Sequence, residues 1–189
     1  VNGSGGGGDI DSVGHTIFVY EGTYSMEFDL ESGQKLIGHS EGLDLIGTAN
    51  DVPAGAAPVL NSASSFPNIE LFGSGVTVRG FVINNTNGKA IAGTSVSTVT
   101  LANLDIAATA TSNGAIELIG TTGTSTLSDV DITGATAETS PALAFISNAG
   151  TINLIGSSVS SFTGGFVLNV GNNSGTISLD ANSDLSSTA

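Results

Sequence analysis

A strand-like pattern that returns about every 25 residues is the feature that most constrains the fold of this chain. Five eight-residue segments align without gaps, and their first residues are separated by 23, 26, 27 and 25 positions. The segments begin at Val76, Val99, Ser125, Ile152 and Ile177. A repeat of this length is one supersecondary unit that cannot bury its apolar face alone, so neighbouring units must stack around a shared core. The sequence therefore predicts a solenoid.

A second column of strand formers has nearly the same period. Its anchors are Ile91, Ile116, Leu143 and Val167, at separations of 25, 27 and 24 positions. Asn, Gly, Ser and Thr, which form tight turns, lie between the two columns, and no segment shows a sustained 3.6-residue apolar period. We predict an all-β fold, a single-stranded parallel β-helix with about 25 residues and three short strands per coil.

The apolar residues indicate a narrow interior. The 189 residues include 39% hydrophobic ones but only 8 Phe, 2 Tyr and no Trp, so the core must be built from Val, Ile, Leu and Ala. These small side chains suit a thin stack of strands better than a broad globular core. The expected inward residues of two neighbouring coils are Val99, Leu101, Leu104 and Ile106, followed by Leu127, Val130 and Ile132.

The chain divides by composition into three parts. Residues 1–14 contain almost nothing to bury and read as a flexible Gly-rich arm or linker, in what we expect to be a processed product or a piece of a longer protein. Residues 15–72 are expected to form entry coils, with a Pro/Ala-rich loop between Gly47 and Pro67 that leaves the stack. Residues 73–189 are expected to form the regular coils.

One segment of the entry region resembles a known family. The residues from Gly14 to Tyr24, followed by Leu36-Ile37-Gly38, read as a strand, a Gly-Thr-Tyr turn and a second strand. This order resembles the entry coil of right-handed parallel β-helix proteins of the pectin-lyase-like class. The motif covers residues 14–40, and the rest of the likeness is in the period. The class includes lyases, hydrolases, adhesins and inert spacers, so the resemblance implies a fold and no single activity.

The charge balance excludes several partners. Seventeen acidic residues face only three cations, Lys35, Arg79 and Lys89, which gives a formal charge of −14. Such a chain cannot neutralise a phosphate backbone, so we expect no nucleic acid partner. An anionic membrane or an anionic polysaccharide such as pectate would be repelled unless a divalent cation intervened. No apolar run is long enough for membrane insertion, and without cysteine the chain has no disulfide or thiolate metal site.

The outward positions of the first strand form a lattice of small polar residues. Side chains two positions apart on a strand share a face, and successive coils place each row about 4.8 Å from the next. The first column starts at Gly75 and continues as Thr98, Thr124, Thr151 and Thr176, and the second contains Thr77, Thr100, Thr126, Asn153 and Ser178. This lattice is similar to the surface of β-solenoid ice-binding proteins. Alternatively, threonine is present only because its stiff, β-branched side chain suits an exposed strand.

Candidate catalytic and metal-binding residues are few. Asp105 and Asp131 align outward in adjacent coils with Asp129 beside the second, so they could hold Ca²⁺ or act as a glycosidase pair. We favour a solvated acidic edge, and we expect no cofactor, with Ca²⁺ as the alternative. A sugar-acid lyase would need a basic residue, and the regular coils offer only two. His15 and His39 are expected at turns or on the surface rather than at a metal.

Together these patterns favour a non-enzymatic structural module. The sequence finishes midway through a coil, which would leave strand edges for adjacent modules or further copies of the chain. An acidic surface rich in Thr, Ser, Gly and Asn looks like the repetitive modules of large bacterial surface proteins. We therefore expect an extracellular or cell-surface fibre or adhesin. The alternatives are a module that binds ice or a neutral glycan through the lattice, and a carbohydrate-active enzyme.

Overall fold

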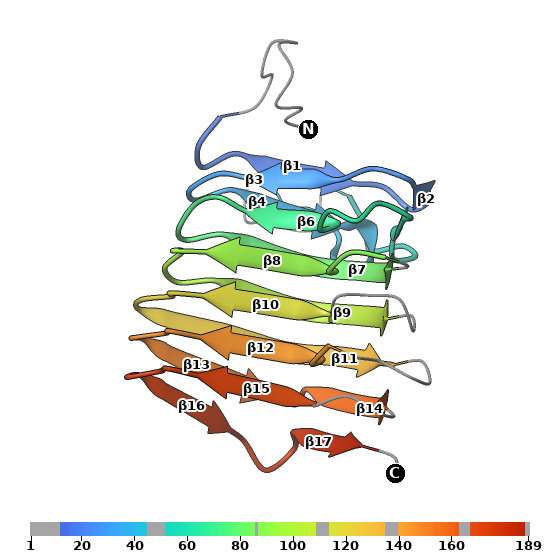
Figure 1. The fold of residues 1–189 in the computed structure, drawn as a ribbon. Coiled ribbons are helices and arrows are strands. Elements are labelled where there is room, and N and C mark those ends of the chain that lie inside the picture. Colours follow the sequence, from blue (N-terminus) through green and yellow to red (C-terminus); the bar gives the residue numbers. More distant parts are fainter. Residues whose placement is uncertain are drawn as a thin grey trace.

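The computed structural model is a parallel β-solenoid, in which strands of successive coils lie above one another (Figure 1). It describes residues 12–44, 52–85, 87–108, 114–134, 140–162 and 167–187, so most of the expected Gly-rich arm lies outside the described residues. The strands are β1 (Thr16–Val19), β2 (Thr23–Tyr24), β3 (Phe28–Leu30), β4 (Lys35–Gly38), β5 (Val59–Ser62), β6 (Ile69–Leu71), β7 (Thr77–Asn85), β8 (Ile91–Thr94), β9 (Thr100–Ala108), β10 (Ile116–Ile119), β11 (Thr124–Thr133), β12 (Leu143–Ile146), β13 (Thr151–Ile155), β14 (Ser158–Phe162), β15 (Leu168–Gly171), β16 (Thr176–Leu179) and β17 (Asp184–Ser187). The one helical element is the 3₁₀ turn η1 (His39–Glu41) among the described residues.

The chain alternates between two parallel sheets. Sheet A has the order β1-β4-β7-β9-β11-β13-β16. Four further strands belong to it: β5 pairs with β2 and β7, and β14 pairs with β11 and β17. Sheet B has the order β3-β6-β8-β10-β12-β15. Each coil therefore contributes strands to both sheets, as a β-helix requires. The predicted all-β solenoid is confirmed.

The register of sheet A is the one that the sequence columns predict. Val78 pairs with Leu101, which pairs with Leu127, and the column continues through Leu154 to Leu179. These pairings reproduce the gapless alignment and its steps of 23, 26, 27 and 25 residues.

The core lies between the sheets and runs along the stack. The seven inward residues expected in two neighbouring coils, from Val99 to Ile132, are all at most 2% exposed. Along the stack, side chains of the same kind follow one another in register, as in the column of Ile83, Ile106 and Ile132. At roughly 1.5–3 kcal/mol for each fully buried aliphatic side chain, a coil offsets its ordering entropy because it shares its interior with both neighbours.

The long strands of sheet A turn a corner at one residue in left-handed conformation. Gly80 in β7, Asn103 in β9 and Asp129 in β11 have φ angles of 78°, 51° and 52°. Two of the three expected short strands are therefore one bent strand in these coils, and they separate at Gly156 into β13 and β14. Asn and Asp tolerate this conformation better than other non-glycine residues. Gly80 is also required sterically, because a Cβ there would lie 2.6 Å from Cγ of Glu41.

Asparagine side chains fix the turn from sheet B to sheet A. Oδ1 of buried Asn148 accepts hydrogen bonds from the backbone N–H and the hydroxyl of Thr121, at 2.8 and 2.7 Å. In the next coil, Nδ2 of Asn173 donates to the carbonyl of Phe145 at 2.7 Å, and its Oδ1 accepts from the N–H of Asn148. Each turn is thus held to the turn before it.

The expected pairing of Leu143 with Val167 is wrong by one residue. Leu143 pairs with Leu168, so the last step in sheet B is 25 residues rather than 24. The link between Asn148 and Asn173 also spans 25 residues, so a 24-residue step would have required a bulge between β15 and this turn.

The entry region contains more strand than expected. The Gly-Thr-Tyr segment, expected to be a turn, places Thr23 and Tyr24 in β2, and four residues of the expected loop between Gly47 and Pro67 form β5. The reason is mutual pairing, because β5 lies between β2 and β7 and both neighbours satisfy its backbone. Of the rest of that loop, residues 47–51 lie outside the described residues.

The shared core predicts unequal effects of two neighbouring substitutions in β11. Leu127→Ala should lower the free energy of unfolding by about 2–5 kcal/mol, because it leaves a cavity among residues of three coils. Ser128→Ala, on the outward side of the same strand, should change it by no more than about 0.5 kcal/mol. Urea unfolding followed by circular dichroism measures both, and equal effects would contradict a core placed on this side of sheet A.

Candidate functional site

The predicted lattice lies on the outward face of sheet A. Thr77, Thr100, Thr126, Asn153 and Ser178 follow one another in register through five strands. Thr124, Thr151 and Thr176 form a parallel column through β11, β13 and β16. All eight are half-buried or exposed, so their side chains face away from the core.

The lattice is less extensive than its sequence columns. Thr98 belongs to the first column, but it lies in the turn before β9 with a φ of 59°, outside the strand. The next outward column contains a single hydroxyl, that of Ser128, since Arg79, Ala102, Ser128 and Ile155 follow one another there. Two complete columns of small polar residues therefore extend only over β11, β13 and β16.

The aligned carboxylates form an exposed edge on the other half of the long strands. Asp105 pairs with Asp131, and the column continues through Ser158 to Asp184. One oxygen of Asp131 accepts a hydrogen bond from the hydroxyl of Ser158, so this carboxylate already has a protein partner. No group of three His, Cys, Asp or Glu residues suited to a metal ion occurs within the described ranges. Calcium at the stacked pair stays a prediction.

The two histidines are not brought together. His15 is exposed, and its Nδ1 accepts a hydrogen bond of 3.1 Å from the N–H of Ser12. His39 begins η1 and is more enclosed than expected, with 16% of its side chain exposed. Its ring lies 5.2 Å from that of Tyr20 and 5.9 Å from that of Phe18. It therefore closes an aromatic cluster at the edge of the entry coils.

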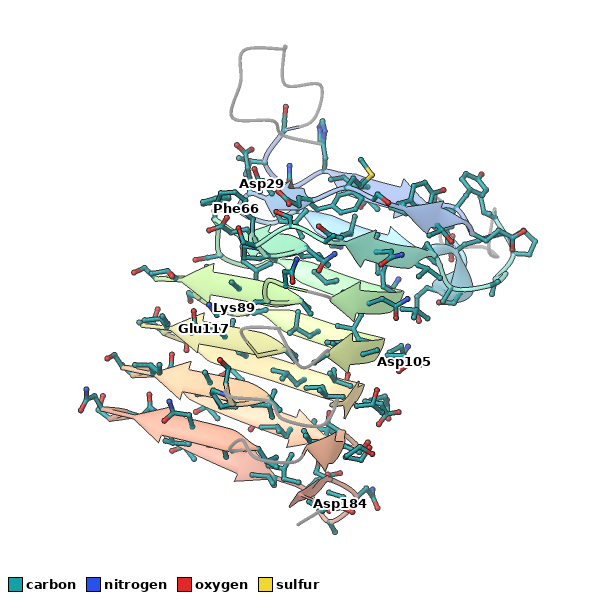
Figure 2. The ribbon with its side chains drawn as sticks, turned by 45° about the vertical axis from the view of Figure 1, so that its right-hand side comes forward. Asp29, Phe66, Lys89, Asp105, Glu117 and Asp184 are labelled. Carbon is teal, nitrogen blue, oxygen red and sulfur yellow. The ribbon has the colours of Figure 1, made fainter. Side chains whose placement is uncertain are left out.

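An acidic hollow on sheet B was not predicted. Glu27, Asp29 and Glu70 line a cavity of about 220 Å³ whose rim carries Phe66 and Phe72, two rings that are 66% and 63% exposed. Asp29 and Phe66 lie close together at this end of the stack, whereas Asp105 lies on its other side (Figure 2). Sequence reasoning missed the hollow because its residues belong to coils joined by an irregular segment.

Burial and repulsion between neighbouring charges raise the pKa of two of these carboxylates. Burial raises the pKa of Asp29, and the charge of Glu27 adds to the effect. Burial also raises the pKa of Glu70, reinforced by the charges of Asp29 and Glu27. Asp29 and Glu70 are register partners in β3 and β6, so their side chains stand side by side.

Comparison with known proteins does not assign the chain to a family. Its sequence matches no protein-family profile, no curated protein and no solved structure. No helix within the described parts of the chain is both long and apolar enough to cross a membrane.

The acidic hollow predicts a gain of stability from removing one charge. An acid whose pKa is raised on folding stabilises the fold below its unfolded pKa, and that contribution is lost as the pH rises through the folded pKa. Glu70→Gln should therefore raise the midpoint of thermal unfolding at pH 7 relative to wild type, with the difference disappearing towards pH 3.5. Scanning calorimetry across this range measures it.

Glu117 supplies a matched control for this substitution. It lies on the same outward column of sheet B, two strands further along, but its carboxylate pairs with Nζ of Lys89 at 3.2 Å. Glu117→Gln should give no gain at pH 7. A gain as large as that of Glu70→Gln would show that net charge, rather than the hollow, is responsible.

Proposed function

We propose that this chain is a non-enzymatic structural module of an extracellular fibre, adhesin or surface protein, and that it acts by stacking coil on coil with a neighbouring copy or domain. The observation that carries the proposal is the last described coil, which presents a formed but uncovered core. The composition, rich in Thr, Ser, Gly and Asn and poor in cations, supports a place among repetitive bacterial surface modules. The resemblance of residues 14–40 to an entry coil supports the right-handed, pectin-lyase-like kind.

Side chains at interior positions of this coil are partly exposed to solvent. Leu154 is 1% exposed, and Leu179, its partner in the next strand, is 45% exposed. In sheet B, Phe145 is fully buried, and its partner Val170 is 49% exposed. The free edges of β15, β16 and β17 pair with no further strand among the described residues. An apolar end bordered by strand edges is a template for parallel pairing.

Polar contacts hold this coil in the geometry of the coils before it. Oδ1 of Asp180 accepts hydrogen bonds from the hydroxyl of Ser183 and the N–H of Gly156, at 2.7 and 3.0 Å. These bonds lower the pKa of Asp180, the Ser183 hydroxyl most of all. The N–H of Asp184 donates to the carbonyl of Ser157 at 3.0 Å. The edge is therefore set at the register that a further coil would need.

Charge disfavours association through any other contact. Two copies that each carry −14 repel one another, so an attractive contact must come from apolar burial and backbone pairing. Added salt screens this repulsion over a Debye length of about 8 Å at physiological ionic strength. Stacking should therefore strengthen as salt is added.

Substitution at the open end tests the proposed function. Wild type should form elongated particles as its concentration rises, more so at high salt, and Leu179→Lys should prevent this by placing a charge in the shared core. Ser178→Lys is the matched control, since it adds the same charge one residue away on the outward side. Analytical ultracentrifugation and negative-stain imaging measure the outcome. A wild type that stays monomeric, or two variants that associate equally, would refute stacking through this end.

A second candidate, binding to ice or a neutral glycan, is favoured by one observation. The two columns of small polar residues on β11, β13 and β16, hydroxyl-bearing except at Asn153, are in uninterrupted register, so their spacing along the stack is regular. A regular array of hydroxyls and methyls offers a repeating surface to an ordered ligand, and it carries no charge to attract anions.

Thermal hysteresis distinguishes this candidate from the first. Wild type should depress the freezing point below the melting point if the lattice binds ice, and Thr124→Tyr should abolish the effect because the ring breaks the flat surface. Thr133→Tyr makes the same change on β11 but beyond the corner, and it should leave the hysteresis intact. The absence of hysteresis in wild type removes ice as the ligand.

A further inference from the structure

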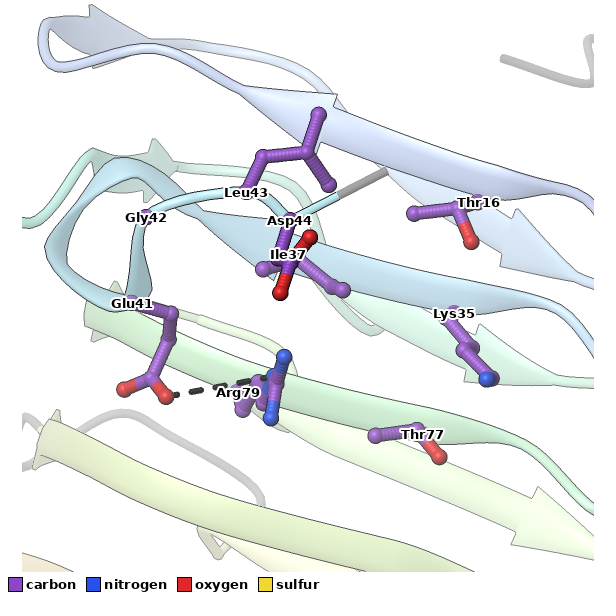
Figure 3. A pocket seen from close by; sticks show the side chains of 9 residues that line it. All are labelled: Thr16, Lys35, Ile37, Glu41, Gly42, Leu43, Asp44, Thr77 and Arg79. Atoms are coloured by element: carbon purple, nitrogen blue, oxygen red, sulfur yellow. Dashed lines mark ion pairs between the residues drawn. The ribbon is translucent and has the colours of Figure 1, made fainter. Parts of the chain in front are cut away.

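A cleft of about 460 Å³ lies against the outward face of sheet A in the entry coils. Its floor is made by β1, β4 and β7, and its wall by the segment that follows β4 (Figure 3). This cleft was not predicted, and it lies apart from the lattice of β11, β13 and β16.

The wall is firmly attached to the coils. The hydroxyl of Ser40 donates to the carbonyl of Gly80 at 3.1 Å, and Leu43 forms a pair of backbone hydrogen bonds with Val52. Ile37 occupies an outward position of β4, and yet it is only 4% exposed. The cleft is therefore a preformed feature, with an apolar surface at Ile37 and Leu43.

Two of the three cations of the chain line this cleft, Lys35 and Arg79. Lys35 is exposed and makes no ion pair with any described residue. The third cation, Lys89, is paired with Glu117 on the other sheet. In a chain of charge −14, the two cations offset the carboxylates of Glu41 and Asp44, so the cleft repels an anion less than the acidic hollow does.

Arg79 retains hydrogen-bonding capacity. Its Nε lies 3.9 Å from Oε2 of Glu41, too far for a hydrogen bond, and this nitrogen is buried without a hydrogen-bond partner among the described residues. Oε1 of Glu41 is already engaged, because it accepts from Nδ2 of Asn103 at 2.7 Å. The side chain as a whole is 42% exposed, so the terminal nitrogens of its guanidinium offer further donors to an acceptor in the cleft.

Hydroxyl groups flank the lysine. Thr16, Lys35 and Thr77 are register partners in β1, β4 and β7, so a threonine lies about 4.8 Å along the stack on either side of Lys35. Figure 3 shows Lys35 between these two threonines, with Arg79 on the same face and Asp44 towards the wall. Lys35 and the two threonines thus supply donors at one side of the cleft, whereas Arg79 lies beside Glu41, with which it forms an ion pair.

We propose that this cleft binds a single oxyanion group, a carboxylate or a sulfate ester, carried by a monosaccharide unit. The ammonium of Lys35, the guanidinium of Arg79 and the two threonine hydroxyls donate to the oxyanion. Glu41 and Asp44 accept from sugar hydroxyls, and Ile37 and Leu43 lie against the apolar face of the ring. The charge of the whole chain limits the ligand to one anionic group at this position. The assignment goes beyond the proposed structural role and does not depend on it.

Titration with three monosaccharides tests the proposal on the full chain. Glucuronate and glucose 6-sulfate carry the two oxyanions, and glucose lacks both. Saturable shifts in the NMR spectrum are expected with one or both anionic sugars and none with glucose. Saturation by only one of them identifies the oxyanion as carboxylate or sulfate, and affinity should fall as salt is added.

Single substitutions localise the binding. Lys35→Gln changes an exposed side chain and should weaken binding about ten-fold or more, and Arg79→Gln should do the same. Lys89→Gln removes an equal charge outside the cleft and should leave the affinity unchanged. The proposal is overturned if neither anionic sugar gives a saturable shift, if glucose binds equally, or if Lys35→Gln weakens binding no more than Lys89→Gln does.

Discussion

Contact between like aliphatic side chains of successive coils is the interaction on which the structure depends. The column from Val78 to Leu154 is at most 1% exposed because each member is covered by the coil before it and the coil after it. Exposure rises to 45% at Leu179, where one cover is missing. Stability in such a stack is approximately a sum of coil terms and nearest-neighbour terms. An uncovered end is therefore a local deficit that a further coil would remove.

Polar residues set the register in which this aliphatic stack forms, and part of that register could be predicted from sequence. The columns of sheet A align because a one-residue slip would turn every aliphatic side chain outward. The left-handed corner at Gly80, Asn103 and Asp129 was also visible, as Gly, Asn or Asp at the fifth place of the first four repeats, although it was not recognised. The last step of sheet B could not be predicted, since the link from Asn148 to Asn173 decides it.

On the surface too, the features that follow the regular repeat could be predicted, and those that depend on individual contacts could not. The lattice follows from the regular repeat, because its members inherit the register of the core. The cleft and the acidic hollow depend on pairings across an irregular segment, Lys35 with Thr77 and Asp29 with Glu70, which are 42 and 41 residues apart. Nothing periodic links these residues, and the strand β5, which fills the interval, is stabilised only by neighbours distant in sequence.

The distribution of charge distinguishes the two surfaces for which we propose partners. An excess of 14 negative charges opposes every contact between copies except one in which burial of apolar area and backbone pairing exceeds the repulsion, and the uncovered last coil is the contact through which we propose that copies stack. The cleft is the reverse case, because Lys35 and Arg79 cancel the charges of Glu41 and Asp44 locally. A stack of copies would leave each cleft on the outward face of sheet A, at the side of the stack rather than at its ends. Assembly and binding of a small anion therefore do not compete for the same surface.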